Sequence, residues 1–152
     1  MKPAAQHFWD KTAERDAERA RHATTVHTTF SSNEVARLAG VSLRQLQWWD
    51  ERGVISPRHD GHRRLYSRQE VIEILVLARL RERGLSLQKM RHLMIFVRRS
   101  LKSAGTHDLY LVTDGRSQFI DSRMDHIIPH LENAKCPMYL INIGALVERV
   151  PK

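Results

Sequence analysis

Residues 44–64 bring together side chains that can bind the base edges and phosphates of a nucleic acid. Arg44, Gln45 and Gln47 fall within four positions, and a His-Arg-Arg run occupies positions 62–64. A glutamine amide can pair with adenine, and the arginine fork matches guanine or a phosphate. The chemistry that these residue types indicate is non-covalent recognition of a polyanion.

The positive charge of the chain is concentrated in its middle. The 152 residues carry a formal net charge of +8. Residues 30–105 hold 15 Lys and Arg against 7 Asp and Glu, whereas residues 1–29 hold 5 against 4 and residues 106–152 hold 5 against 6. A localised basic surface attracts polyphosphates by counterion release, so nucleic acid is the leading partner. An acidic membrane surface is the weaker alternative, and a merely solvated face would give the same composition.

The length and composition favour one compact core with a small appendage. We expect the protein in a reducing cytoplasm. No apolar run approaches the ~18 residues that span a bilayer, so we expect no membrane segment. Asp10 and Glu14 interrupt the region where a signal peptide would have its apolar core. The single cysteine, Cys136, cannot form an intrachain disulfide.

Two short helices joined by a tight turn are predicted from residue 31 onward. Ser31 with Glu34 forms a capping box for the first helix, and Gly40 ends it. Ser42 caps the second helix and Gly53 ends it. Its apolar residues recur at helical spacing, and they are Leu43, Leu46 and Trp49. This pattern predicts a helix-turn-helix.

A two-stranded hairpin and two longer helices are predicted next. The Asp60-Gly61 turn signal and the alternation on either side of it favour a hairpin, or wing. Ser67 with Glu70 then caps a helix. Its apolar residues are too many to lie on one face of a surface helix, so it should form the centre of the core. A following helix is lined at spacings of three and four by Leu87, Met90, Leu93, Met94, Val97 and Leu101.

The two ends of the chain follow other patterns. Residues 106–152 predict a small α+β unit: two strands joined by an Asp114-Gly115 turn, a helix interrupted by Pro129, and a further strand, with "ALVERV" left unassigned. Residues 1–29 favour helix by propensity but offer little for burial, so a flexible or partner-dependent helical arm is expected.

The segment from Phe30 to Met94 resembles the MerR family of bacterial transcription regulators. It carries, in unbroken order, a capped helix, "GVS", an aromatic-pair helix, "GVISPR", a Gly-x-Arg wing that ends in Tyr-Ser, a long helix and "GLSLQKMRHLM". The resemblance implies a mainly α fold, with a winged helix-turn-helix domain at 30–105 followed by a small α+β domain at 106–152. It also implies sequence-specific binding of double-stranded DNA in the bacterial nucleoid. For this chain we expect no catalytic residue, no cofactor and no metal.

The resemblance and the residue chemistry together give a set of candidate DNA contacts. In the family, the wing arginine and the aromatic pair belong to the DNA-facing surface, and the matching positions are Arg63, Trp48 and Trp49. The second helix suits the major groove, and the wing suits the flanking backbone or minor groove. The candidates are Ser42, Arg44, Gln45, Gln47, Trp48, Arg58, His62, Arg63, Arg64 and Tyr66.

The second helix departs from the family pattern. Family members usually show Thr-Leu-Arg-Tyr-Tyr-Glu, where this chain has Gln-Leu-Gln-Trp-Trp-Asp at positions 45–50. The neutral Gln47 replaces an arginine that binds phosphate, and two indoles that only donate replace hydroxyl-bearing rings, so the site sequence and the affinity should differ. Since consecutive helix positions point about 100° apart, we predict that Trp49 is the more buried indole and that Trp48 lies at the DNA-facing margin.

A homodimer is the default assembly because two-fold DNA sites match two-fold proteins. The long dimerisation helix typical of the family is missing from the pattern, so the helix at 87–101, the N-terminal segment or strand pairing must replace it. An alternative function is a DNA-binding antitoxin or a phage-type architectural protein, in which residues 106–152 bind a protein partner.

Two sharper hypotheses carry little weight. His126 and His130, four apart and near Cys136, would suit a metal, but Pro129 disturbs their spacing and no second cysteine is present. A nuclease centre would use His107 with the aspartates of the last segment, yet turn and cap chemistry accounts for Asp114 and Asp125. We therefore expect neither a metal site nor an enzyme.

Overall fold

The computed structural model describes residues 28–104 and 108–152, so the helical arm predicted at 1–29 lies almost wholly outside the described residues. Helix α2 (Ser32–Ala39) begins with the predicted capping box of Ser31 and Glu34 and ends at Gly40, whose φ is 66°. Helix α3 (Leu43–Glu51) begins at Ser42, whose hydroxyl accepts from the Gln45 N–H at 3.0 Å. The predicted helix-turn-helix is therefore present.

A three-stranded sheet lies beside these helices. Strands β2 (Arg58–Asp60) and β3 (Arg63–Ser67) form the predicted hairpin, with Asp60 opposite Arg63 and a left-handed Gly61 in the turn. Strand β1 (Thr29–Ser31) pairs with the other edge of β3, giving the order β1-β3-β2. The sequence pattern did not predict β1, because three residues are too few to show alternation.

Two long helices form the centre of the molecule. Helix α4 (Arg68–Glu82) starts at the predicted Ser67–Glu70 capping box and buries nine of its residues. Helix α5 (Leu87–Ala104) packs on α4 through the predicted side chains, of which Leu93, Met94 and Val97 are fully buried. The central place predicted for α4 is confirmed.

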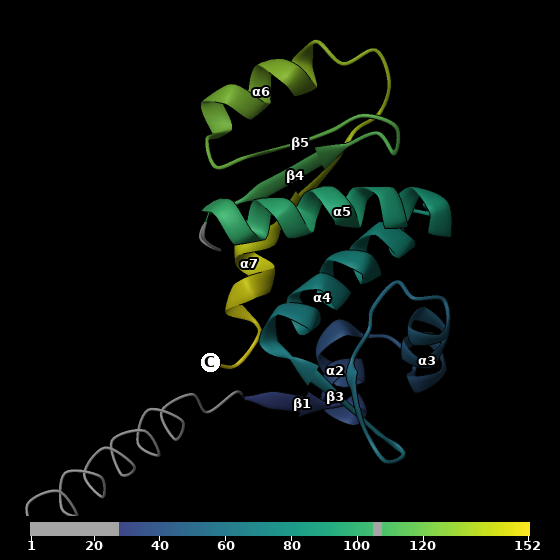
Figure 1. Cartoon of the computed structure of the whole chain (residues 1–152). Coiled ribbons are helices and arrows are strands. Elements are labelled where there is room, and N and C mark those ends of the chain that lie inside the picture. Colours follow the sequence, from purple (N-terminus) through teal and green to yellow (C-terminus); the bar gives the residue numbers. More distant parts are fainter. Residues whose placement is uncertain (1–27, 105–107) are drawn as a thin grey trace, which may run out of the picture.

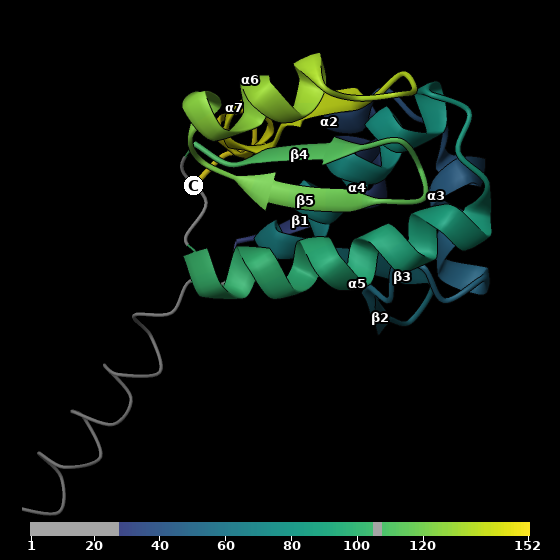
Figure 2. The ribbon, with the colours of Figure 1, turned by 90° about the horizontal axis from the view of Figure 1, so that it is seen from above.

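The last part of the chain forms a second three-stranded sheet with two helices. The elements are β4 (Tyr110–Thr113), β5 (Gln118–Asp121), α6 (Met124–Glu132), β6 (Tyr139–Asn142) and α7 (Ile143–Glu148). The strand order is β5-β4-β6, and both pairings are antiparallel. Strands β4 and β5 lie between α5 and α6 (Figures 1 and 2).

Two expectations about this part need correction or completion. Pro129 does not interrupt α6: the helix passes through it, and the N–H of Asn133 donates to the Pro129 carbonyl at 3.1 Å. A proline removes only one ladder bond, and the buried Ile127 holds the helix on its sheet. The unassigned "ALVERV" belongs to α7, where Leu146 and Val147 are buried.

The C-terminal elements share a core with the helix-turn-helix. Helix α7 packs against α4, and its buried residues join the same apolar cluster. The Arg68 guanidinium donates to the carbonyls of Val147 and Val150, and Arg149 donates to the Leu38 carbonyl at 2.8 Å. A boundary between two domains at residue 105 stays a prediction. Across 28–104 and 108–152, no helix combines the length and the apolar character that a membrane span requires.

Candidate nucleic-acid interface

Helix α3 presents one polar face to solvent and one apolar face to the core. Arg44, Gln47 and Trp48 are exposed, whereas Leu46 and Trp49 are buried. The amide of Gln47 donates to the Glu51 carboxylate at 2.7 Å, which orients the glutamine along the helix. The exposed face therefore offers hydrogen-bonding groups on a rigid support.

The two tryptophans have different environments, as predicted. Trp49 is 0% exposed and Trp48 is 37% exposed. The Arg52 guanidinium lies over the Trp48 ring, 5.7 Å from its centroid, which is cation–π geometry. The predicted difference in burial is confirmed, while a DNA contact by Trp48 stays a prediction.

Two neighbours on α3 lie differently from what periodicity suggests. Leu43, predicted on the apolar face, is 51% exposed and is the first residue of α3. Gln45 is half-buried, and its amide nitrogen is covered and has no hydrogen-bond partner. Of the predicted contacts on this helix, Arg44 and Gln47 are therefore the more accessible.

The hairpin holds four exposed basic side chains. Arg58 and His59 lie on β2, His62 in the turn and Arg63 at the start of β3. The turn requires a left-handed residue, which Gly61 supplies with a φ of 59°. The sequence thus builds a short projecting loop whose exposed groups are mainly cationic.

Asp50 connects α3 to the hairpin. Its Oδ2 accepts from Arg64 Nε at 2.6 Å and lies 3.0 Å from His59 Nε2. The hydrogen bond to Asp50 raises the pKa of the Arg64 guanidinium above its ordinary value. Arg64 therefore has a partner within the protein, and its neighbour Arg63 is the more exposed of the two.

The prediction that Tyr66 contacts DNA conflicts with its position in the structure. It was predicted as a DNA contact, but its side chain is 1% exposed and packs in the core. The pleat of β3 turns alternate residues inward, and Tyr66 stands opposite the buried Phe30 of β1. Burial raises the pKa of its phenol above the ordinary value. Its side chain cannot touch a duplex from this position.

A groove runs beside α3, and sequence reasoning missed part of its lining. It has a volume of about 540 Å³ and lies between α3 and the turn that joins α4 to α5. Trp48 and Arg44 line one side, and Arg81 lines the other. The only sequence signal for Arg81 is its place near the end of a helix in the basic segment, which does not by itself show which way it points.

The residues of the metal and nuclease hypotheses are engaged otherwise. His126 Nδ1 lies 3.0 Å from Asp121 Oδ2, and His130 Nδ1 lies 3.0 Å from the His126 carbonyl. Within the described ranges, no three potential ligands come together to hold a metal ion. Position 107 is outside those ranges.

The aspartates of this segment have structural partners. Asp114 accepts from the N–H groups of Arg116 and Ser117, both at 2.7 Å, and these bonds lower its pKa to about 2. The turn role predicted for Asp114 is confirmed. Asp125 pairs with the Arg123 guanidinium in the first turn of α6, so an ion pair takes the place of the predicted cap.

Comparisons with known proteins agree with this geometry. Residues 30–95 match the model of the family described as MerR HTH family regulatory protein, which confirms the resemblance found in the sequence. The nodulation protein NolA of Bradyrhizobium is 34% identical over 74 residues, 47% of this chain and 31% of that protein.

Two mycobacterial relatives match a longer stretch. An uncharacterised HTH-type transcriptional regulator of Mycobacterium bovis is 24% identical over 127 residues, 78% of this chain and 55% of that protein, and one of Mycobacterium tuberculosis matches to the same extent. The chain therefore spans 31% to 55% of the length of these relatives.

Proposed function

We propose that this chain, whose residues 30–95 form a MerR-family helix-turn-helix segment, is a DNA-binding transcription regulator that recognises double-stranded DNA by sequence as a homodimer. The observation that carries the proposal is the pairing of two exposed surfaces, the polar face of α3 and the basic hairpin, through one carboxylate, Asp50. A linked helix and wing have a fixed spacing, which gives register on a duplex as well as affinity.

Helix α3 is the element proposed to enter the major groove. Arg44 and Gln47 are exposed on it, and their groups suit guanine or phosphate and adenine respectively. Ser42 caps the N-terminus of α3 and is exposed there, at the end of the helix where its dipole favours a phosphate. Trp48 adds an indole at the margin of the same face.

The hairpin is the element proposed to contact the flanking backbone as a wing. Arg58, His62 and Arg63 are exposed on the hairpin, and the two arginines gain from the concentrated negative potential of a phosphate backbone or a narrow minor groove. Arg64 acts indirectly in this proposal, because its bond to Asp50 holds the wing against α3.

The bacterial relatives and the basic middle segment support action on the nucleoid in the cytoplasm. A homodimer would place two copies of α3 in successive major grooves of a two-fold site. Residues 108–152 are proposed to receive a protein partner or an effector, and they pack on the helix-turn-helix through α7.

The test is selection of duplexes from a random pool by the full chain, followed by titration at several salt concentrations. Arg63→Ala should weaken binding to selected and random duplexes alike and reduce the salt slope by about one. Arg44→Ala and Gln47→Ala should instead change the selected sequence, since a bidentate base contact carries about 1–3 kcal/mol of discrimination. Arg116→Ala, an exposed arginine of the C-terminal hairpin, is the matched control.

Two outcomes would count against the proposal. Equal salt slopes for Arg63→Ala and the unaltered protein would exclude the hairpin as a backbone contact. Failure to enrich any sequence, with binding retained, would favour the architectural alternative over a sequence-specific regulator.

A further inference from the structure

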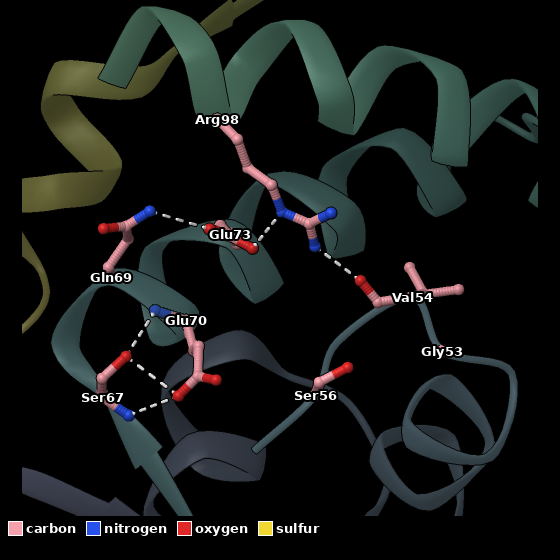
Figure 3. Close-up of a pocket in the computed structure, with 8 residues that line it drawn as sticks. All are labelled: Gly53, Val54, Ser56, Ser67, Gln69, Glu70, Glu73 and Arg98. Atoms are coloured by element: carbon pink, nitrogen blue, oxygen red, sulfur yellow. Dashed lines mark hydrogen bonds and ion pairs between the residues drawn. The ribbon is translucent and has the colours of Figure 1, made fainter. Parts of the chain in front are cut away.

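Arg98 of α5 bridges two parts of the molecule that are far apart in sequence. Its Nε donates to Glu73 Oε2 of α4 at 2.7 Å, and its Nη2 donates to the Val54 carbonyl at 2.6 Å. Figure 3 shows the guanidinium between these two acceptors. Arg98 is also one of the residues that line a hollow of about 350 Å³. One planar group thus joins α4, α5 and the segment that follows α3.

Glu73 fixes the direction in which Arg98 points. Among the described residues it is the only charged one that is buried, and Gln69 Nε2 donates to its other oxygen at 3.2 Å. A buried carboxylate is costly unless it is paired and hydrogen-bonded. Because the guanidinium is planar, the bond from Nε to Glu73 leaves Nη2 aimed at the Val54 carbonyl (Figure 3).

Val54 is the point at which α3 passes into the wing. The N–H groups of Val54 and Ile55 both donate to the carbonyl of Trp49, on the last turn of α3, at 2.9 and 3.4 Å. Val54 therefore closes the end of α3 with its N–H and binds α5 with its carbonyl. The chain then continues into β2 and the hairpin.

A second arginine of α5 holds the same junction. Arg91 Nη2 donates to the carbonyl of Arg52, the residue that ends α3. The two contacts lie seven residues apart on α5, two turns of helix, so they fall on one face. Helix α5 therefore binds two backbone carbonyls, one on either side of Gly53.

We propose that Arg98 is a positioning residue for DNA recognition: it holds the end of α3 and the start of the wing in a fixed place on α5. The inference rests on the proposed function, because it assumes that α3 and the wing are the DNA-binding elements. It assigns Arg98 no contact with DNA. Its role is to fix the position of groups such as Arg44 and Arg63 by way of the backbone at residue 54.

The decisive variant removes both members of the ion pair. Arg98→Met alone leaves the Glu73 carboxylate buried and unpaired, so it would destabilise the protein for a reason unrelated to position. Glu73→Gln combined with Arg98→Met removes both charges and keeps the shapes, yet the Val54 carbonyl still loses its donor. Glu73→Gln alone is the control that keeps that donor, and Arg99→Met, at the exposed neighbouring position, controls for loss of charge on α5.

We call the contact between Arg98 and the Val54 carbonyl the clamp. Amide hydrogen exchange tests, without DNA, whether the clamp stabilises the end of α3. In the double variant, the amides of Val54 and Ile55 should exchange about tenfold faster or more, the factor that a hydrogen bond from a charged group carries. Amides of β4, far from the junction, should keep their rates and show that the fold is intact. Exchange at positions 54 and 55 that is equal in the double variant, Glu73→Gln and Arg99→Met would overturn the clamp.

DNA titration tests what the clamp does for recognition. The ratio of affinities for a selected and a random duplex should fall about tenfold in the double variant, with the salt slope on random DNA unchanged. A slope reduced by about one, with both duplexes weakened equally, would make Arg98 a phosphate contact and overturn the positioning role. If the unaltered protein binds no duplex, the proposed function fails, and the exchange experiment still decides whether the clamp exists.

Discussion

The carboxylate of Asp50 accepts a hydrogen bond from Arg64 Nε at 2.6 Å, and this contact joins α3 to the hairpin across 14 residues of sequence. Both side chains are partly buried, and His59 Nε2 lies 3.0 Å from the same oxygen. Helix α3 and the hairpin are thus connected at their facing sides by Asp50, and Arg98 binds the segment that joins them. Under the proposed function, a stiff connection of this kind would favour DNA sites with one spacing between base and backbone contacts.

Replacing Asp50 should reduce specificity more than stability. In Asp50→Ala, Arg64 loses its acceptor, and the free energy of unfolding should fall by about 1 kcal/mol, because a pair near the surface contributes little. The ratio of affinities for selected and random duplexes should fall about tenfold, since the wing is no longer held against α3. Glu148→Ala, at an exposed position of α7 outside the proposed interface, is the control for loss of one negative charge. Equal specificity ratios for the two variants would show that the contact has no role in recognition.

The two adjacent tryptophans should contribute very differently to the stability of the protein. Trp49→Ala removes a fully buried indole and should lower the free energy of unfolding by about 3–5 kcal/mol. Trp48→Ala removes a partly exposed ring that has a cation–π contact with Arg52. The free energy of unfolding should therefore fall by less than about 1 kcal/mol. Urea denaturation measures both values. A large loss for Trp48→Ala would place that indole in the core and remove it from the DNA-facing margin.

Local sequence patterns predicted the helices and the hairpin well because their signals are local. The capping boxes at Ser31 and Ser67 and the left-handed Gly40 and Gly61 each involve a few consecutive residues, and the structure has them all. The burial of Tyr66 escaped prediction because it depends on the packing of α2 and α4 against β3, which no local pattern within β3 shows.

The candidate site was predicted only in part for the same reason. The exposure of Arg44 and Arg63 could be predicted from the sequence, because Arg44 lies on the polar face of an amphipathic helix and Arg63 lies beside a hairpin turn. The roles of Asp50 and Arg98 depend on partners 14 and 44 residues away, and neither spacing leaves a trace in a pattern of apolar residues. Only the packing of α5 over the end of α3 brings Arg98 to the Val54 carbonyl.

The Asp114 turn should make stability depend on pH in acid. Backbone N–H groups lower the pKa of its carboxyl from 3.8 to about 2, so at a pH between these values the folded state keeps the carboxylate while the unfolded state binds a proton. Since the unfolded state then binds more protons, the free energy of unfolding should fall as the pH falls through this range. Asp114→Asn should flatten that part of the profile.

Urea denaturation at steps of pH between 4 and 2 measures this effect. Glu132→Gln, an exposed carboxylate on α6, is the control for loss of one negative charge. A profile of equal steepness in Asp114→Asn and in the unaltered protein would contradict the role given to the turn.

The C-terminal elements should unfold together with the helix-turn-helix. Leu146 of α7 is 5% exposed and belongs to the core cluster that contains α4, so Leu146→Ala should lower the free energy of unfolding by about 2–5 kcal/mol. Because the buried residues of α4 and Trp49 of α3 belong to the same apolar cluster, the tryptophan fluorescence and the far-UV circular dichroism should shift to the same lower urea midpoint. Leu140→Ala, at an exposed leucine of β6, should leave the midpoint nearly unchanged. If instead the circular dichroism changed first and the tryptophan transition stayed in place, residues 108–152 would be an independent unit, and the packing of α7 on α4 would contribute nothing to the stability of the helix-turn-helix.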